Sequence, residues 1–239
     1  MNLVNNYYIL DNKEFKNAFF IKPYNFNTNI DSNILNNNYN AIKKILNIDK
    51  ICTVKQEHTD IVKIINGDNI NDVEVADGMI TNLKNVGLAI KVADCQAIFL
   101  YDRVNKVIGN IHSGWRGTIK KIIKNAIDIM TENYNSKLED IEVYILPSID
   151  KCHFEVQVDV YNEFKNSFNN IDKYTIYKKD IDRYYIDTKS LNRDYLISLG
   201  INKNNIYVNE LCSVCEGKHI HSYRFDKEKS GRNLAVISL

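Results

Sequence analysis

The sequence predicts a single mixed α/β or α+β domain over residues 1–239. Three observations lead to this prediction: short apolar runs crowd the centre of the chain, an amphipathic helical pattern follows them, and strands and helices then alternate toward the C-terminus. Single α/β domains often reach this length, and no repeat of fixed period divides the chain. The 44% hydrophobic content, with 15 Tyr and 9 Phe, is enough for a large core.

The first 50 residues contain two short apolar runs and an Asn-rich stretch. The apolar runs are Tyr7–Leu10 and Ala18–Ile21, and the Asn-rich segment 25–40 is expected to be a surface loop. Apolar residues at helical spacing resume after it, at Ala41, Ile42, Ile45 and Leu46. The Asn-rich segment is therefore interpreted as an insertion and not as a linker between domains.

The centre of the chain is expected to be rich in strands. Four short apolar runs are separated by Asn, Asp and Gly: Ile61–Ile65, Val86–Val92, Ala97–Tyr101 and Lys106–Ile111. After Gly117 the period changes, because apolar residues at spacings of three and four line one face of a helix: Ile119, Ile122, Ile123, Ala126, Ile127 and Met130. A sheet followed by a covering helix is the expected arrangement.

The C-terminal half continues this mixture of strands and helices. The pattern predicts a buried strand at Ile141–Leu146, helices near Val156–Phe168 and Thr188–Leu199, and a closing strand at Leu234–Leu239. Central sheets covered by helices are therefore expected throughout.

Charge and hydropathy exclude several classes of protein. The 31 Lys and Arg balance 30 Asp and Glu, so a net charge of +1 gives no field that would attract nucleic acid. No run approaches 18 apolar residues, and Met1–Leu10 lacks the pattern of a secretion signal. A cytoplasmic protein without membrane contact is expected, in which the five cysteines are reduced thiols.

Three residues could hold a metal ion: His58, Cys95 and His112. Each lies near the end of a predicted strand, beside small residues or turn formers. Two imidazoles and one thiolate suit zinc or copper, and three protein ligands leave a fourth position open, as in catalytic sites. A lone His is more often solvated and a lone Cys more often part of the core. The local sequence must therefore decide between a metal site and these simpler interpretations.

That local sequence favours a site. His112 begins the segment His-Ser-Gly-Trp-Arg-Gly, which joins a strand to the predicted helix. Backbone N–H groups at such a helix start, together with Arg116, could bind a phosphate or a developing oxyanion. Trp115 could pack in the core or stack on a base or sugar.

Several motifs resemble the laccase-domain family, formerly called multicopper polyphenol oxidases. They are Gln56-x-His58, Ala76 to Thr81 (Ala-Asp-Gly-Met-Ile-Thr), Ala93-Asp94-Cys95, His112 to Gly117, Pro147-Ser148-Ile149, Cys152 to Val156, Asp187 with Leu191-Asn192, Leu211-Cys212, Ser222-Tyr223-Arg224 and Gly231-Arg232. Their order and spacing match the family over nearly all of the chain after Ile51.

The resemblance implies a zinc-dependent purine nucleoside enzyme. Members of the family are described as phosphorylases of adenosine, inosine, guanosine or methylthioadenosine, as adenosine deaminases, and in some cases as peptidoglycan editing factors. The resemblance also implies zinc held by His58, Cys95 and His112, and a layered α/β/β/α fold shared with certain cysteine hydrolases. A multicopper oxidase would need more His ligands than the five in this chain.

The chain departs from the family pattern at four places. Thr59 and Ser113 stand where the family usually has Gly and Ala, and His221 replaces a Phe. The family commonly carries an Asn-Arg pair near the N-terminus that can meet phosphate, whereas the first Arg here is Arg103 and Lys43 is the suggested substitute.

The resemblance suggests roles for the remaining site residues. For deamination, zinc would activate water for attack on C6 of the purine, and Asp94 would carry the proton or orient an imidazole. For phosphorolysis, Arg116 would bind phosphate bidentately, with Arg224 and Arg232 as secondary candidates. Cys152 and Glu155 are expected to line the pocket, although a core cysteine and a surface carboxylate are the simpler interpretations.

The pair Cys212-x-x-Cys215 is interpreted as two ordinary thiols. A structural zinc needs four ligands, and the sequence holds no second Cys pair, although His219 or His221 could in principle complete a site.

Other functions remain open on the sequence alone. Cys95 could be the nucleophile and His112 the base of a cysteine hydrolase, such as an amidase that edits peptidoglycan precursors. A copper-dependent polyphenol oxidase is another alternative, because copper can occupy such a site in vitro. A third is a noncatalytic protein that senses a nucleoside.

Overall fold

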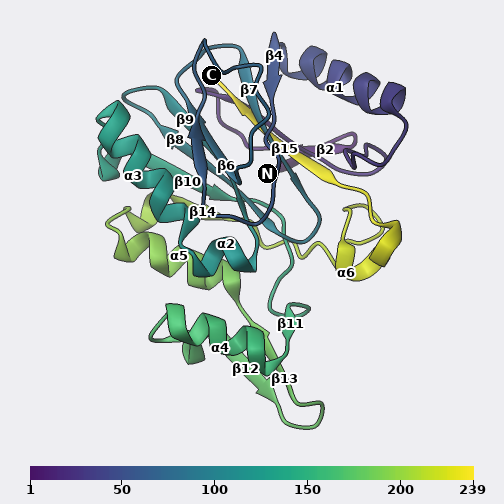
Figure 1. Cartoon of the computed structure of the whole chain (residues 1–239), viewed down its shortest axis with the longest axis vertical. Coiled ribbons are helices and arrows are strands. Elements are labelled where there is room, and N and C mark those ends of the chain that lie inside the picture. The colour runs from purple at the N-terminus through teal and green to yellow at the C-terminus, as the bar shows by residue number, and fades with distance from the viewer.

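The computed structural model describes all 239 residues and contains two six-stranded sheets and one three-stranded sheet (Figure 1). The first large sheet has the strand order β1 (Asn2–Val4), β2 (Tyr7–Ile9), β3 (Lys16–Phe20), β15 (Asn233–Ser238), β7 (Val86–Val92) and β4 (Lys50–Cys52). The second has the order β14 (Ile206–Val208), β10 (Ile141–Ile145), β8 (Gln96–Asp102), β9 (Val107–Ser113), β6 (Gly78–Thr81) and β5 (Val62–Ile64).

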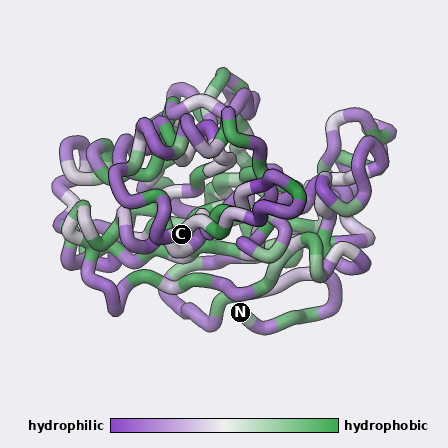
Figure 2. Tube along the Cα trace, turned by 90° about the horizontal axis from the view of Figure 1, so that it is seen from below, coloured by the Kyte–Doolittle hydropathy of each residue, from purple (hydrophilic) through white to green (hydrophobic).

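The two large sheets pack face to face and are covered by helices on their outer faces. The largest hydrophobic cluster joins them, with Leu88 and Ile90 of β7 on one side and Phe99 of β8 on the other. Helix α1 (Ser32–Leu46) covers the first sheet, while α3 (Ile122–Tyr134) and α5 (Thr188–Ser198) cover the second. Figure 2 shows hydrophobic stretches running along the stacked strands. The expected mixed α/β fold with α/β/β/α layers is confirmed.

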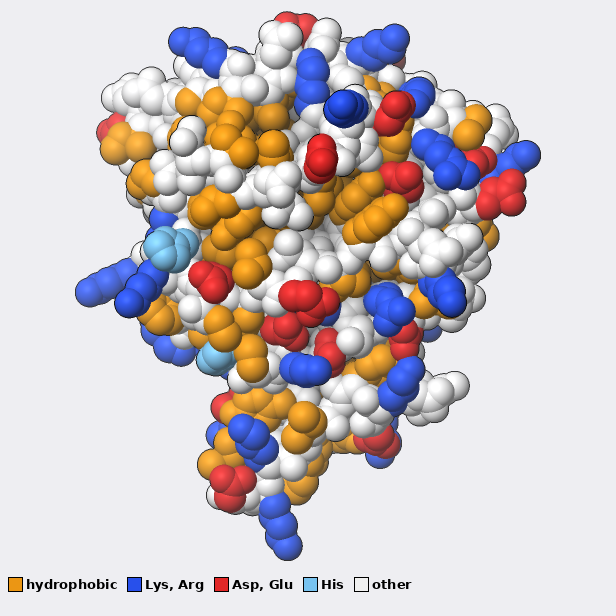
Figure 3. All heavy atoms as spheres, turned by 180° about the vertical axis from the view of Figure 1, so that it is seen from behind, with side chains coloured by type: hydrophobic (Ala, Val, Ile, Leu, Met, Phe, Trp, Pro, Cys, Tyr) orange, Lys and Arg blue, Asp and Glu red, His pale blue; other side chains and the backbone are white.

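A small lobe projects from this body at the bottom of Figure 1. It consists of α4 (Val158–Ser167) and the three-stranded sheet of β11 (Glu155–Val156), β13 (Arg183–Ile186) and β12 (Thr175–Lys178). A separate hydrophobic cluster around Phe164 and Ile186 forms its core. Figure 3 shows the lobe from behind, with acidic and basic side chains interspersed on this face. The sequence predicted helix α4 but not this third sheet.

The Asn-rich segment is a loop, as expected from its composition, only over residues 25–31, and the rest of it is helical. Helix α1 begins within it at Ser32, because the Asp31 carboxylate accepts hydrogen bonds from the first free N–H groups, those of Asn33 and Ile34. Four apolar residues at spacings of four, three and four then face the first sheet: Leu35, Tyr39, Ile42 and Leu46. Asn therefore occupies the solvent face of an amphipathic helix.

The helix expected after Gly117 is two helices. Helix α2 (Trp115–Ile119) ends before Lys121, whose φ of 62° lies in the left-handed region, and α3 begins at Ile122. A residue in that region cannot continue a right-handed helix, so the chain turns between the two. A further short helix, α6 (Tyr223–Asp226), lies near the C-terminus. No helix combines the length and the apolar character needed to cross a membrane.

Candidate metal centre and adjoining cavity

Two crossings between the large sheets bring the expected metal ligands together. Strand β7 of the first sheet ends at Val92 and β8 of the second begins at Gln96, so Cys95 lies where the chain passes between them. His58 lies on the other crossing, between β4 and β5. His112, near the end of β9, pairs with Ala97 of β8 and so comes close to Cys95.

The three ligand atoms form a compact group. The ligand nitrogens of the two histidines and the Cys95 sulfur lie within 4.8 Å of one another, and the sulfur is 4.0 Å from His58 Nε2. That distance is slightly longer than the roughly 3.6 Å expected between N and S ligands of tetrahedral zinc. A side chain at Gly114 would not fit, because a Cβ there would lie 2.9 Å from His58 Cδ2 and 3.0 Å from the Cys95 sulfur.

The buried carboxylate of Asp77 orients the imidazole of His112 and holds the backbone of His58. Its Oδ1 lies 2.7 Å from His112 Nδ1, which leaves Nε2 of that ring free to bind a metal. The same carboxylate accepts the backbone N–H of His58 at 3.1 Å and of Thr59 at 2.6 Å. These bonds hold His58 at a φ of 58°, a left-handed conformation uncommon for residues other than glycine. The sequence assigned no role to Asp77, because one acidic residue gives no local signal.

The electrostatics of the group favour a thiolate. Burial alone would raise the pKa of the Cys95 thiol, but the charges and hydrogen bonds of His112 and His58 outweigh burial and lower that pKa to about 6. Burial would likewise lower the pKa of His112, whereas Cys95 and Asp77 raise it to about 9. A deprotonated thiol is the form that binds metal, so the donor set fits zinc or copper.

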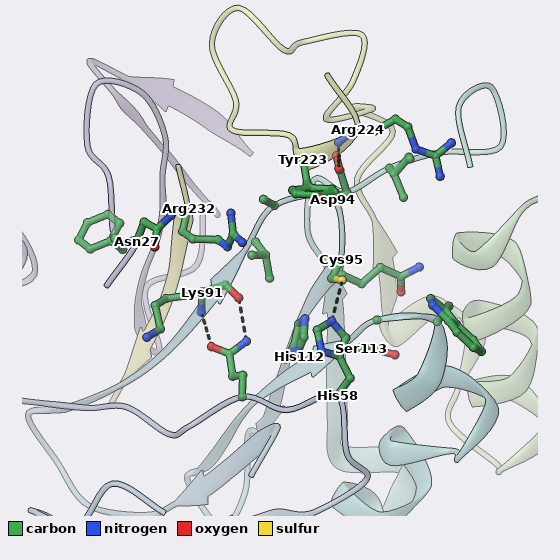
Figure 4. A pocket seen from close by; sticks show the side chains of 18 of the residues that line it. Asn27, His58, Lys91, Asp94, Cys95, His112, Ser113, Tyr223, Arg224 and Arg232 are labelled. Carbon is green, nitrogen blue, oxygen red and sulfur yellow. Dashed lines mark hydrogen bonds between the residues drawn. The ribbon is translucent and has the colours of Figure 1, made fainter. Parts of the chain in front are cut away.

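A cavity of about 700 Å³ opens beside the three ligands (Figure 4). Its wall contains the aromatic residues Trp115, Phe154 and Tyr223, together with Phe26. Figure 4 shows Tyr223 and Arg224 on one side of the ligand group and Lys91 with Arg232 on another. This volume lies within the range of roughly 300–1,000 Å³ typical of small-molecule sites.

Lys91 and Arg232 are two of the cations on the cavity wall, and the sequence pointed only to Arg232. Arg232 was a secondary candidate, whereas Lys91 was not considered; both line the cavity, and neither forms an ion pair with an acidic side chain. Burial and the nearby charge of Arg232 lower the pKa of Lys91. Gln56 fixes the backbone of Lys91 through two hydrogen bonds, of 2.8 and 2.9 Å.

Of the other expected site residues, Asp94, Trp115 and Arg224 line the cavity. The Asp94 carboxylate accepts two hydrogen bonds of 2.6 Å, from Ser213 Oγ and from the backbone N–H of Arg224. Its φ of 84° is again left-handed. Asp94 thus joins the loop that carries Cys95 to two C-terminal segments.

Three expected site residues lie outside the cavity wall. Arg116 is exposed, with its guanidinium 4.2 Å above the Trp115 ring, because the first turn of α2 directs it outward. The Glu155 carboxylate turns toward the small lobe, where it binds Tyr185 and Arg183. Cys152 faces a different group of side chains. Lys43, the suggested phosphate ligand, lies on α1 and is also absent from the wall.

Cys152 belongs to a second compact group, the Cys3His cluster, formed with His153, Cys212 and Cys215. Their ligand atoms also lie within 4.8 Å of one another. Cys212 and Cys215 therefore have neighbours that could hold a metal ion with them, which the interpretation as two ordinary thiols did not include. The partners are the adjacent pair Cys152 and His153, not His219 or His221, because His221 Nε2 contacts the Tyr24 carbonyl.

Comparison with known proteins finds a matching family model and relatives that share one name. The family model described as multi-copper polyphenol oxidoreductase laccase matches residues 23–239. A purine nucleoside phosphorylase of Clostridium acetobutylicum is 31% identical, over 98% of this chain and 97% of its own. A second purine nucleoside phosphorylase, of Borreliella burgdorferi, is 33% identical over 85% of this chain and 83% of its own.

A solved structure has the same fold. The hypothetical protein YfiH of Bacillus licheniformis superposes with a TM-score of 0.90 at 25% sequence identity, covering 99% of this chain and 100% of its own.

Proposed function

Because the chain belongs to the laccase-domain family, we propose that it is a cytoplasmic, zinc-dependent purine nucleoside phosphorylase that also deaminates adenosine. Adenosine, inosine, guanosine and methylthioadenosine are the proposed substrates, with phosphate as the second. The observation that carries the proposal is the group of His58, Cys95 and His112 at a cavity whose wall also contains Lys91 and Arg232, neither of them in an ion pair. The names of the relatives support phosphorolysis in particular.

The three ligands suit zinc better than a multicopper centre. Two imidazoles and a thiolate leave one tetrahedral position open, and a bound zinc ion would supply the Lewis acidity that activates water or polarises a substrate. The chain holds five histidines in all, and His153 and His221 already face other groups. Too few remain for the several His-rich sites of a multicopper oxidase.

The aromatic wall of the cavity suits the purine. Trp115 from the middle of the chain and Tyr223 from near its C-terminus line it, and Phe154 adds a third ring. Flat faces of this kind stack on a base without reading its exocyclic groups, which fits a pocket that accepts several purines.

Lys91 and Arg232 are the proposed phosphate ligands, in place of Arg116. Both are partly buried at the cavity, and no acidic side chain neutralises them. A guanidinium can hold two phosphate oxygens at once, and a lysine adds a compact charge beside it. Phosphate held there would be oriented for attack on the anomeric carbon of the sugar while the purine leaves. Asn27 and Asn29 line the same cavity and could hydrogen-bond the sugar.

Asp94 is proposed as a positioning residue. Both of its carboxylate oxygens accept short hydrogen bonds, so it fixes the loop of Cys95 relative to Arg224. An Asp94→Asn variant would lose one of these bonds, since an amide has only one acceptor oxygen. Full activity in that variant would contradict this role.

One observation favours a second candidate, a cysteine hydrolase. The lowered pKa of Cys95 beside the raised pKa of His112 is also what a nucleophilic thiolate with an imidazole partner requires. Such an enzyme would hydrolyse an amide without metal. It would survive chelation and lose activity on alkylation of Cys95.

The test is release of purine base from each of the four nucleosides, with and without phosphate. The proposal predicts phosphate-dependent base and sugar phosphate, loss of both on chelation, and phosphate-independent inosine from adenosine. Arg116→Ala is the matched control, because Arg116 is exposed outside the cavity. A metal-free chain that is inert toward nucleosides and cleaves amides would establish the hydrolase instead.

A further inference from the structure

The Cys3His cluster has the dimensions of a zinc site. The Cys152 and Cys215 sulfurs are 3.8 Å apart, and His153 Nδ1 lies 3.6 Å from the sulfurs of both Cys212 and Cys215. Zinc bonds of about 2.3 Å to sulfur and about 2.0–2.1 Å to nitrogen give tetrahedral edges of roughly 3.8 Å between two sulfurs and roughly 3.6 Å between sulfur and nitrogen. The Cys152 to His153 edge, at 3.1 Å, is shorter than these values.

The fold brings these four residues together from distant parts of the sequence. Strands β10 and β14 are parallel neighbours, so the loops that follow them leave the same edge of the second sheet. Cys152 and His153 lie in the first loop, and Cys212 and Cys215 in a turn of the second, which closes through a bond from Glu216 N–H to the Cys212 carbonyl. An isolated bridge between Ser148 and Cys212 keeps the two loops side by side.

A buried lysine, Lys189, contacts both of these loops. Lys189 is only 3% exposed, and its ammonium donates to the carbonyls of Asn209 and Leu211 at 2.9 Å each. The Asp150 carboxylate lies 3.6 Å from the same ammonium. The loops are therefore positioned in part by contacts outside the cluster, so the four ligands are preorganised for a metal.

From this geometry we infer that Cys152, His153, Cys212 and Cys215 form a second metal site, a structural zinc site separate from the centre at Cys95. Three thiolates and one imidazole complete a tetrahedron and leave no position open for substrate, as in structural zinc sites. Soft, sulfur-rich tetrahedral sites select zinc over the hard cations that prefer oxygen ligands. The cluster lies outside the cavity wall, in agreement with a structural role.

The site would rigidify the part of the cavity wall nearest the small lobe. The guanidinium of Arg224 donates to the His153 carbonyl at 2.9 Å and to the Glu155 carbonyl at 3.1 Å. Ser213, between the two C-terminal cysteines of the cluster, donates to Asp94 beside the first centre. Zinc at the Cys3His cluster thus adds to the contacts that hold the segment where the lobe joins the body. Through these hydrogen bonds it also stabilises one wall of the reaction cavity.

The test is the zinc content of the full chain, purified after expression with added zinc. The wild type is expected to contain two zinc ions per chain, and His58→Ala/Cys95→Ser to contain one. Cys152→Ser/Cys215→Ser is also expected to contain one, and the combination of all four substitutions none. Cobalt in His58→Ala/Cys95→Ser is expected to show the intense thiolate-to-metal absorption of a three-sulfur tetrahedral site.

Two matched controls accompany these variants. Cys52→Ala removes a cysteine that faces the Ile70 carbonyl, and His219→Ala removes a nearby exposed histidine outside the cluster; both are expected to keep two zinc ions. X-ray absorption of the zinc in His58→Ala/Cys95→Ser reads the ligands directly without disturbing the cluster. Absence of zinc from His58→Ala/Cys95→Ser, or zinc bound there without three sulfurs, would overturn the inference.

Discussion

The centre at His58, Cys95 and His112 and the Cys3His cluster use the same residue types in opposite ways. The first has three ligands, one of them backed by the buried Asp77 carboxylate, and opens onto a cavity. The second has four ligands, two of them exposed, and borders no part of that cavity. An open position suits reaction with a substrate, whereas a complete tetrahedron suits support of the fold. The number of ligands and the presence of a cavity therefore separate the two roles more clearly than residue type does.

The largest expected effect is loss of the first centre. Cys95→Ser should reduce phosphate-dependent base release to the detection limit, because a serine hydroxyl stays protonated and binds zinc poorly. Activity and zinc content are measured on the same sample. Cys215→Ser, which also removes one thiol, should keep measurable activity. An equal loss of base release in both variants would contradict the assignment of reaction to the first centre and of fold support to the second.

Loss of the Asp77 carboxylate, which contacts the His112 ring, should have a smaller effect. Asp77→Asn should weaken zinc binding at the first centre by about 10- to 100-fold, as is usual when a partner of a metal-bound histidine is removed. Competition with a chelator of known affinity measures this change, with wild type as reference. An unchanged affinity would mean that Asp77 serves only the fold of the His58 loop.

Lys91 and Arg232 should determine the affinity for phosphate and leave zinc binding unchanged. Arg232→Ala should raise the KM for phosphate by about 10- to 100-fold, since a hydrogen bond to a charged group contributes about 1.5–3 kcal/mol. Initial rates at varied phosphate and saturating inosine measure the effect, together with zinc content. Arg116→Ala should leave this KM unchanged. The opposite pair of results would show that phosphate binds at Arg116, at the start of α2, and not at Arg232.

The smallest expected effect concerns the metal-free chain. With a pKa of about 6, Cys95 is mostly thiolate at pH 7, and its alkylation rate should rise with pH around a midpoint near 6. Burial and the neighbouring thiols instead raise the pKa of Cys152, so its alkylation should require alkaline pH. Because nucleophilicity falls with pKa, Cys95 should react only about fourfold faster at pH 7 than an ordinary thiol with a pKa of 9.0.

Alkylation followed by peptide mass analysis measures both cysteines in one sample. A midpoint for Cys95 near the ordinary thiol value of 9.0 would show that the two imidazoles do not stabilise its thiolate.

The sequence predicted the regular parts of the molecule well. Strong periodic patterns located strands β7 to β10 and helices α4 and α5, because burial on one face leaves a direct record in the spacing of apolar residues. Composition misled at the Asn-rich segment, where the capping side chain of Asp31 and the packing of α1 on the first sheet override a loop-like composition.

The two centres differed in how much the sequence revealed of them. His58, Cys95 and His112 stood out through motifs shared with a family, and the structure brings the three together. The partners of Cys212 and Cys215 could not be inferred, because the pairing of β10 with β14 brings Cys152 and His153 to them from some 60 residues away. Lys91 was missed because its exposure to the cavity depends on which face of β7 is open.

The most direct test of the central claim is reconstitution of the metal-free protein with zinc during phosphorolysis of inosine. We expect hypoxanthine and ribose phosphate to appear in proportion to zinc bound at His58, Cys95 and His112, with Cys152→Ser/Cys215→Ser requiring only one equivalent for full recovery. Phosphorolysis by the metal-free chain, or none after both sites are filled, would contradict the account.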